Sequence, residues 1–318
     1  MRTPPPIPSS VIDAAVRAAH AIENPAYTFV RGGEDSWGFN VASPSGAYRL
    51  KIYNKATDLE VRLEATFRLH HEKGFTGVVC PIRSGDSSFT FEVAGRRAAI
   101  FPYIFGVPAS DRVMSTHQRQ EVGRMLAGIH RTDLGDLPIP RERFDTYWGD
   151  AAQKVLDAVP AALQSDNRYQ RATAELLLPL RATLHAEIER FRTSGLAARQ
   201  ARIPNVLCHG DPTSGNILVG SGGIYLIDWD GMCYAPKELD LLHFGDGNPV
   251  LHGYADVSGN VALDAGVLGY YQARWNVGEI ADFGGRILFE DHTGVQHEHD
   301  LAQLRNFLRY SGLDTTDV

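Results

Sequence analysis

One short polar stretch limits the possible fold more than any other part of this sequence. Residues 207–218 read LCHGDPTSGNIL, and residues 225–230 read YLIDWD. Apolar, strand-favouring residues flank the polar ones on both sides. Asp211 and Asn216 are therefore expected on a loop between two short strands, and Asp228 at the end of the next strand. The pattern predicts a compact β element that presents several polar side chains at one edge.

The residue types in this stretch are those that phosphoryl transfer requires. One carboxylate orients the attacking hydroxyl, while an amide oxygen and a second carboxylate hold the Mg²⁺ that bridges the nucleotide phosphates. Protein kinases use the pattern H-R-D-x-x-x-x-N followed by a metal-binding Asp. Here His209-Gly210-Asp211 is followed by Asn216 and then by Asp228. A simple polar turn is the alternative, but the ordered spacing and the flanking strands favour the chemical interpretation.

These motifs resemble those of the aminoglycoside phosphotransferase and choline kinase family, relatives of protein kinases that phosphorylate hydroxyl groups of small molecules. The run PKELDLL at 236–242 extends the similarity. Tyr270 and Tyr271, with the helix through 279–281, are most similar to the spectinomycin phosphotransferase branch.

The resemblance implies a role for each polar residue of the loop. Asp211 would be the catalytic base or hydroxyl-orienting residue, and Asn216 and Asp228 would bind the metal. His209 would brace the loop, and Asp240 would organise it from below by pairing with backbone amides.

The rest of the chain predicts an α+β, two-lobed, protein-kinase-like fold. Residues 1–103 would form a nucleotide-binding lobe with a small antiparallel sheet. Residues 104–318 would form a mainly helical lobe for catalysis and substrate binding. The first lobe is expected to contain a helix over 58–73 and five strands, at 27–31, 37–42, 47–53, 89–93 and 97–103.

Lys51 is the candidate nucleotide-binding cation of the first lobe. It alternates with apolar Leu50 and Ile52 in the third predicted strand. A kinase needs one ammonium at this place for the nucleotide phosphates, positioned by a helix carboxylate. Glu60 and Glu64 lie one helical turn apart, and similarity to the family's helix favours Glu64. Two solvated glutamates are the alternative.

The phosphate-covering loop is assigned by its position. Residues 32–36, GGEDS, lack the pattern G-x-G-x-x-G but lie between the first two predicted strands. Backbone N–H groups of such a turn bind phosphate oxygens, with Ser36 beside them and the two acidic side chains pointing outward. The resemblance places the base at Phe101 and Tyr103. Because main-chain groups would read the base, ATP is expected and GTP stays open as an alternative.

The charge balance bears on the substrate. The chain has 31 Lys and Arg against 38 Asp and Glu, a formal charge of −7. Binding to nucleic acid or to an anionic membrane needs a dense basic surface, so neither partner is expected. An acidic protein attracts cationic small molecules. The candidate partners for a substrate ammonium group are Asp246, Glu279 and Asp282.

Three widely spaced cysteines and the absence of a long apolar run predict a reducing, cytoplasmic setting. Cys80, Cys208 and Cys233 form no C-x-x-C pair, so neither disulfides nor structural zinc is indicated. His292, His297 and His299 are interpreted as a solvated loop rather than as a zinc site. No segment reaches the roughly 20 apolar residues of a spanning helix, and the N-terminus lacks a signal-peptide core.

The predicted function is ATP-dependent phosphorylation of a hydroxyl on a cationic antibiotic, of the aminoglycoside or spectinomycin type. A metabolic kinase for choline, homoserine or a sugar is the first alternative. Choline kinases enclose a quaternary ammonium with aromatic side chains, and Tyr270, Tyr271 and Trp275 are candidates for this role. The second alternative is an inactive pseudokinase that only binds nucleotide. The sequence leaves the oligomeric state open.

Overall fold

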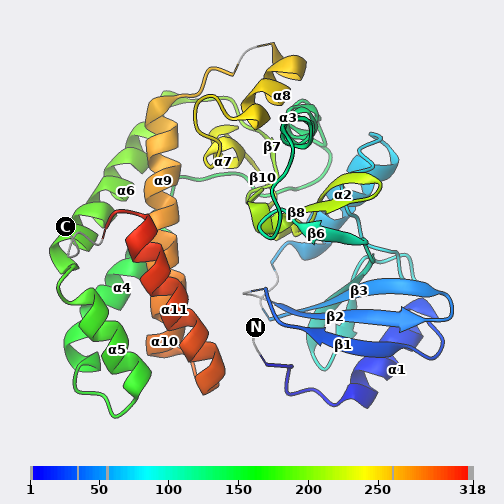
Figure 1. The fold of residues 1–318 in the computed structure, drawn as a ribbon, viewed down its shortest axis with the longest axis horizontal. Helices are drawn as coiled ribbons and strands as arrows, with labels where there is room; N and C mark the ends of the chain where they lie inside the picture. The colour runs from blue at the N-terminus through cyan, green and yellow to red at the C-terminus, as the bar shows by residue number, and fades with distance from the viewer. Residues whose placement is uncertain (1–2, 34–35, 55–56, 260, 314–318) are drawn as a thin grey trace. The chain divides into compact units, whose positions relative to one another are not determined.

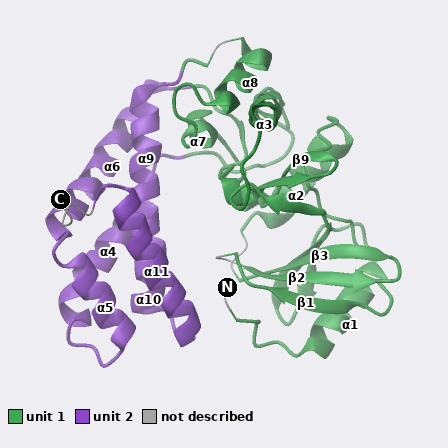
Figure 2. Cartoon of the chain, viewed as in Figure 1, with its two compact units in different colours: residues 1, 3–142, 204–262 green, residues 2, 143–203, 263–318 purple. Residues whose placement is uncertain are grey.

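The computed structural model describes residues 3–33, 36–54, 57–259 and 261–313. The chain divides into two compact units (Figure 2). Residues 3–142 and 204–262 form most of the first unit, and residues 143–203 and 263–318 most of the second. The lobe boundary expected at residue 103 lies within the first unit. All the nucleotide-site and catalytic candidates named above belong to this unit.

The N-terminal part of the first unit is an antiparallel sheet in the order β1-β2-β3-β5-β4 (Figure 1). Alternating apolar residues from the central strands and from helix α1 (Ser9–His20) form its core, which includes Val16, Val41, Leu50, Ile52 and Ile100. Helix α2 (Leu59–His71) follows β3 in the chain. The strands are β1 (Ala26–Val30), β2 (Ser36–Ser43), β3 (Gly46–Tyr53), β4 (Phe91–Val93) and β5 (Arg96–Pro102).

The remaining strands of the first unit are short and join distant parts of the chain. β7 (Val206–Cys208) pairs with β10 (Cys233–Ala235). β8 (Ile217–Gly220) lies between β9 (Gly223–Leu226) and β6 (Gly106–Pro108). The polar loop occupies the connection from β7 to β8, and Asp228 follows β9, as the sequence predicts.

Helices complete the first unit. Helix α3 (Thr116–His130) begins at a capping box in which Ser115 and Gln118 bond each other's backbone N–H. It packs against α8 (Pro249–Ser258), and the short α7 (Glu238–Leu241) carries Asp240.

The second unit is helical in its described residues. The aromatic side chains Tyr270 and Tyr271 are 2% and 1% exposed, and Tyr270 stacks on Phe191 with ring centroids 5.5 Å apart. These two tyrosines are therefore core residues and do not provide the aromatic enclosure expected of a choline site. The helices are α4 (Tyr147–Ala162), α5 (Arg168–Leu177), α6 (Arg181–Ala201), α9 (Ala265–Glu279), a π-helical turn (Ile280–Gly284), α10 (Gly285–Phe289) and α11 (Gly294–Tyr310).

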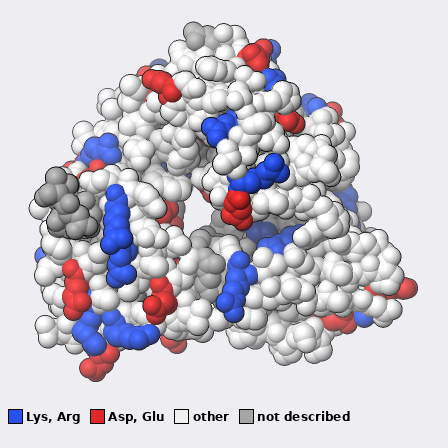
Figure 3. All heavy atoms as spheres, in the orientation of Figure 1, with Lys and Arg blue, Asp and Glu red and all other residues white. Residues whose placement is uncertain are grey.

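The fold class is the expected α+β, protein-kinase-like arrangement of a small antiparallel sheet and a mainly helical remainder. Within the described residues, every helix is too short or too polar to cross a lipid bilayer. In each unit, the side shown in Figure 3 carries both acidic and basic side chains.

Candidate active site

The polar loop after β7 holds Asp211 in a fixed orientation. The side-chain nitrogen of Asn216 donates hydrogen bonds to the Asp211 carboxylate at 2.8 Å and to its backbone carbonyl at 2.9 Å. These bonds engage Oδ2 of Asp211. The other oxygen, Oδ1, is buried and has no hydrogen-bond partner among the described residues. Because buried polar atoms are normally hydrogen-bonded, this oxygen is a candidate acceptor for a ligand group.

Burial makes Asp211 a stronger base than an ordinary carboxylate. Burial, with the negative charge of Asp228 as a second cause, raises the pKa of Asp211 to about 6. The group is still ionised at neutral pH, and its higher pKa favours proton acceptance.

Asp240 supports the loop from the interior, and the predicted pairing with backbone amides is confirmed. Its carboxylate accepts hydrogen bonds from the backbone N–H groups of His209 at 2.7 Å and Gly210 at 2.8 Å. It also lies 3.0 Å from Nε2 of buried His130. Burial acts to raise the pKa of Asp240, but the hydrogen bond and charge of His130 and the backbone donors outweigh it and lower the pKa.

Gly210 allows the chain to turn between His209 and Asp211. Its φ of +94° is in the region that favours glycine. A Cβ atom at this position would lie 2.2 Å from the backbone oxygen of Gly231. The close approach lets the loop run directly beside the segment that carries Asp228 and Asp230.

Lys51 meets two of these carboxylates. Its ammonium lies 2.7 Å from Asp228 and 2.8 Å from Asp230, although about 180 residues separate them in the chain. Burial acts to lower the pKa of Lys51, but the carboxylates outweigh it and raise the pKa. Burial likewise acts to raise the pKa of Asp228, and the Lys51 ammonium outweighs it, so the pKa is lowered. The structure therefore brings the candidate phosphate-binding cation and the candidate metal ligand together.

The expected pair of Lys51 with a carboxylate of α2 is not formed. Glu64 accepts hydrogen bonds from Arg68, one turn along the same helix, at 2.7 Å and 3.2 Å. Glu60 accepts from the backbone N–H of Phe89 and from the Thr90 hydroxyl. The assignment of Glu64 to the nucleotide site is wrong for this structure, because the Lys51 ammonium is already neutralised by two nearer carboxylates.

Lys51, Asn216, Asp228 and Asp230 line a cleft of about 440 Å³ within the first unit. Ser36, buried at the start of β2, lines it together with Phe101 and Tyr103 at the end of β5. Gly32 and Gly33 of the predicted phosphate loop line it as well. The loop's acidic residues, Glu34 and Asp35, lie outside the described residues. A cleft of this size suits a nucleotide or another small ligand.

The donor set fits a Mg²⁺ ion. Magnesium takes oxygen ligands, commonly one or two carboxylates completed by water and substrate phosphates. Asn216 uses its amide nitrogen on Asp211, so its carbonyl oxygen is left for a cation. Asp228 adds a carboxylate that lines the same cleft.

The cleft contains an arginine that the sequence analysis missed. Arg49 lines the cleft and donates a hydrogen bond from Nη1 to Asn40 at 2.9 Å. It precedes Lys51 by two residues in β3, so strand alternation places both side chains on one face. The alternation of side chains along this strand, which pointed to Lys51, could also have predicted that Arg49 faces the cleft.

The three candidate residues for a substrate ammonium group occupy different places. Asp246 is exposed in the loop after α7, in the first unit. Glu279 ends α9 and is half-buried, and Asp282 is exposed on the π-helical turn; both belong to the second unit. Their role in substrate binding stays a prediction.

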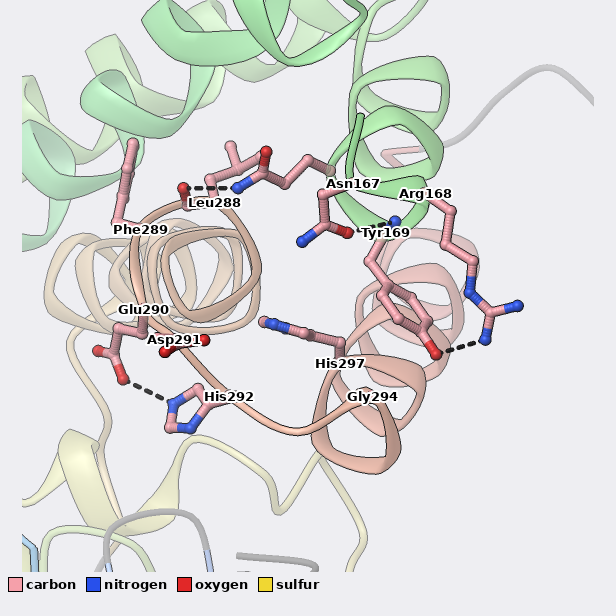
Figure 4. A pocket seen from close by; sticks show the side chains of 11 residues that line it. Asn167, Arg168, Tyr169, Leu288, Phe289, Glu290, Asp291, His292, Gly294 and His297 are labelled. Atoms are coloured by element: carbon pink, nitrogen blue, oxygen red, sulfur yellow. Dashed lines mark hydrogen bonds and ion pairs between the residues drawn. The ribbon is translucent and has the colours of Figure 1, made fainter. Parts of the chain in front are cut away.

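A second cavity, of about 460 Å³, lies in the second unit between the starts of α5 and α11 (Figure 4). His292 bonds Glu290 at 2.8 Å, and the ring of His297 points into the cavity beside Tyr169. The interpretation of His292, His297 and His299 as a solvated loop is wrong for His299, which lies on helix α11, and also for His297. His297 is 5% exposed on α11, because a helix capped by Thr293 turns its ring inward.

The comparison with protein families decides the assignment. A model described as the phosphotransferase enzyme family matches residues 26–275, which include the sheet, the cleft and the polar loop. The chain belongs to the phosphotransferase enzyme family. Members of this family are enzymes, so the cleft lined by Lys51, Asn216 and Asp228 is the candidate active site of a phosphotransferase.

Three of the proteins that this chain resembles share about a quarter of its sequence or less. Protein StrN of Streptomyces griseus is 26% identical over 285 residues, covering 86% of this chain and 82% of that protein. Among solved structures, spectinomycin phosphotransferase APH(9)-Ia, in complex with ADP and spectinomycin, is similar with a TM-score of 0.79. Its identity is 20%, over 98% of this chain and 100% of that one. Choline kinase from Cryptosporidium parvum is similar with a TM-score of 0.53 and 12% identity, over 96% of this chain and 98% of that one.

Proposed function

We propose that this phosphotransferase transfers the terminal phosphoryl group of ATP to a hydroxyl of a cationic small molecule, an antibiotic of the aminoglycoside or spectinomycin type. GTP is an alternative donor. The observation that carries the proposal is the convergence of Lys51, Asn216 and Asp228 on one cleft, with Asn216 hydrogen-bonded to Asp211. An inactive nucleotide-binding protein would not require a buried, unsatisfied carboxylate oxygen at Asp211.

Asp211 would act on the acceptor hydroxyl. Its Oδ1 accepts the hydroxyl hydrogen bond, so that the hydroxyl oxygen points a lone pair at the phosphorus. As the oxygen–phosphorus bond forms and the bond to the leaving phosphate breaks, the hydroxyl proton passes to the same carboxylate. Asn216 keeps Asp211 in place throughout, because its amide nitrogen holds the other carboxylate oxygen.

The charges of the nucleotide would be met by the other residues of the cleft. Bound Mg²⁺ supplies charge neutralisation at the phosphates, and Asp228 with the Asn216 carbonyl would hold it. Lys51 would bind the phosphates beside it. Ser36 and the backbone of Gly32 and Gly33 would cover them.

Three observations support a cationic antibiotic as the acceptor. The chain carries a formal charge of −7, which favours a cationic ligand. The spectinomycin phosphotransferase aligns over nearly the full length of both chains. Tyr270 and Tyr271 are buried in the core, so these two side chains are not available to enclose choline. Asp246, Glu279 and Asp282 are the proposed partners of the substrate's ammonium groups.

The test is a panel of acceptors with radiolabelled ATP and Mg²⁺. It contains spectinomycin, several aminoglycosides, choline, homoserine and simple sugars. Label on the antibiotics alone supports the proposal. Label on choline, homoserine or a sugar instead replaces it with a metabolic kinase. Binding of ATP without label on any compound favours the inactive alternative. Repeating the assay with labelled GTP decides the donor.

A further inference from the structure

Arg49 lines the cleft on the same strand face as Lys51, and on its other side it pairs with Phe101 of the expected base site. Its partner in the sheet register is Asn40, and Lys51 pairs with Gly38 on the same neighbouring strand. A Cβ atom on Gly38 would lie 2.3 Å from Nη2 and 2.7 Å from Cζ of Arg49. The guanidinium therefore covers Gly38 and lies level with Lys51 along the sheet. A glycine at position 38 makes the room for it.

The charge of Arg49 lacks an anionic partner in the described part of the chain. The one hydrogen bond of its guanidinium goes to the neutral side chain of Asn40. Asp228, the acidic group whose charge acts on it, is hydrogen-bonded to Lys51. Burial lowers the pKa of Arg49, against the opposing effects of Tyr103 and Asp228. A partly buried cation with only a neutral partner is costly, and an anion in the cleft would relieve that cost.

We propose that Arg49 is a second cation for the nucleotide, which grips phosphate oxygens with its guanidinium while Lys51 binds beside it. This inference rests on the proposed function, since it presumes a nucleoside triphosphate in this cleft. A guanidinium has five N–H donors in a planar fork and matches two phosphate oxygens at once. Asn40 holds one edge of the fork, which leaves the other donors for the ligand.

Calorimetric titration of the full chain with ATP and with adenosine, in the presence of Mg²⁺, tests the assignment. Arg49→Met removes the charge and keeps the length of the side chain. We expect it to weaken ATP binding roughly 10-fold to 100-fold and to leave adenosine binding unchanged. Arg49→Lys keeps the positive charge but lacks the planar guanidinium. Its ATP affinity is expected to lie between those of the unsubstituted chain and the Arg49→Met variant. Arg97→Met, at an exposed position of β5, is the matched control and leaves both affinities unchanged.

Gly38→Ala provides a second test that retains the arginine. The added methyl group would displace the guanidinium, so ATP binding weakens while adenosine binding is kept. Thermal unfolding reports whether each variant is folded. Unchanged ATP affinity in both folded variants overturns the inference, as does an equal loss for ATP and adenosine, which would place Arg49 on the nucleoside. If the unsubstituted chain binds no ATP, the proposed function itself fails.

Discussion

At the scale of single residues, the site depends on how each oxygen of Asp211 is used. Asn216 engages Oδ2, while buried Oδ1 is left for a donor that the described chain does not supply. A carboxylate held in this way orients a hydroxyl without itself having to move.

Asp211→Ala should therefore lower kcat at least about 100-fold, because both positioning and proton acceptance are lost. The affinity for nucleotide should change little, since Lys51 and Asp228 are untouched. Steady-state kinetics and a thermal unfolding curve of the same sample check this. If the folded variant keeps a tenth of the activity, Asp211 is not the residue that orients the hydroxyl and accepts its proton.

Lys51→Ala should raise KM for the nucleotide, because the phosphates lose an ammonium that is already in the cleft. Lys154→Ala is the control, since Lys154 lies over the ring of Phe289 in the second unit. KM is measured for ATP at saturating acceptor. Equal KM values for the Lys51 variant and the unsubstituted chain would place the phosphates elsewhere.

At the scale of elements, the polar loop works because it runs against the segment after β9. Gly210→Ala should destabilise the protein by about 1–3 kcal/mol, because it forces a side chain into a positive-φ position and against Gly231. Gly215→Ala, in the same loop with open space around its Cβ position, is the control and should be close to neutral. Urea denaturation compares the two midpoints. Similar midpoints for both variants would show that the close approach is unimportant.

The elements that sequence alone predicted are those with strong local signals. Alternation gave the sheet strands and Lys51, and the spacing from Asp211 to Asn216 gave the loop that the structure contains. The strand β6 was missed because Gly106–Pro108 has no strand pattern of its own and pairs with β8, more than 100 residues later. The prediction that Glu64 pairs with Lys51 was wrong because the true partners of Lys51 lie far away in the chain. The spacing of Glu64 to Arg68 already favoured a pair within the helix, and the position of Asp230 beside Lys51 depends on the fold.

At the scale of the whole molecule, buried Asp240 links catalysis to stability. Its pKa is lowered in the folded state, so it stabilises the fold at neutral pH, and this stability is lost as the pH falls below about 4. Asp240→Asn should reduce the free energy of unfolding at pH 7 and flatten its decline in acid.

Urea denaturation at pH 7 and at several acidic pH values measures both effects. Asp256→Asn changes an exposed carboxylate paired with Arg124 and serves as the control. An acid decline as steep in the Asp240 variant as in the unsubstituted chain would contradict the assignment.

The interrupted course of the first unit has a consequence for synthesis in the cell. Its strands β1 to β6 leave the ribosome early, but β7 to β10 emerge only after residues 143–203 have been made. Until then β6 has no partner, and Lys51 lacks the carboxylates that neutralise it. During that interval the cleft is incomplete and the edge of β6 is unpaired, and unpaired strand edges of incompletely folded chains are prone to aggregate.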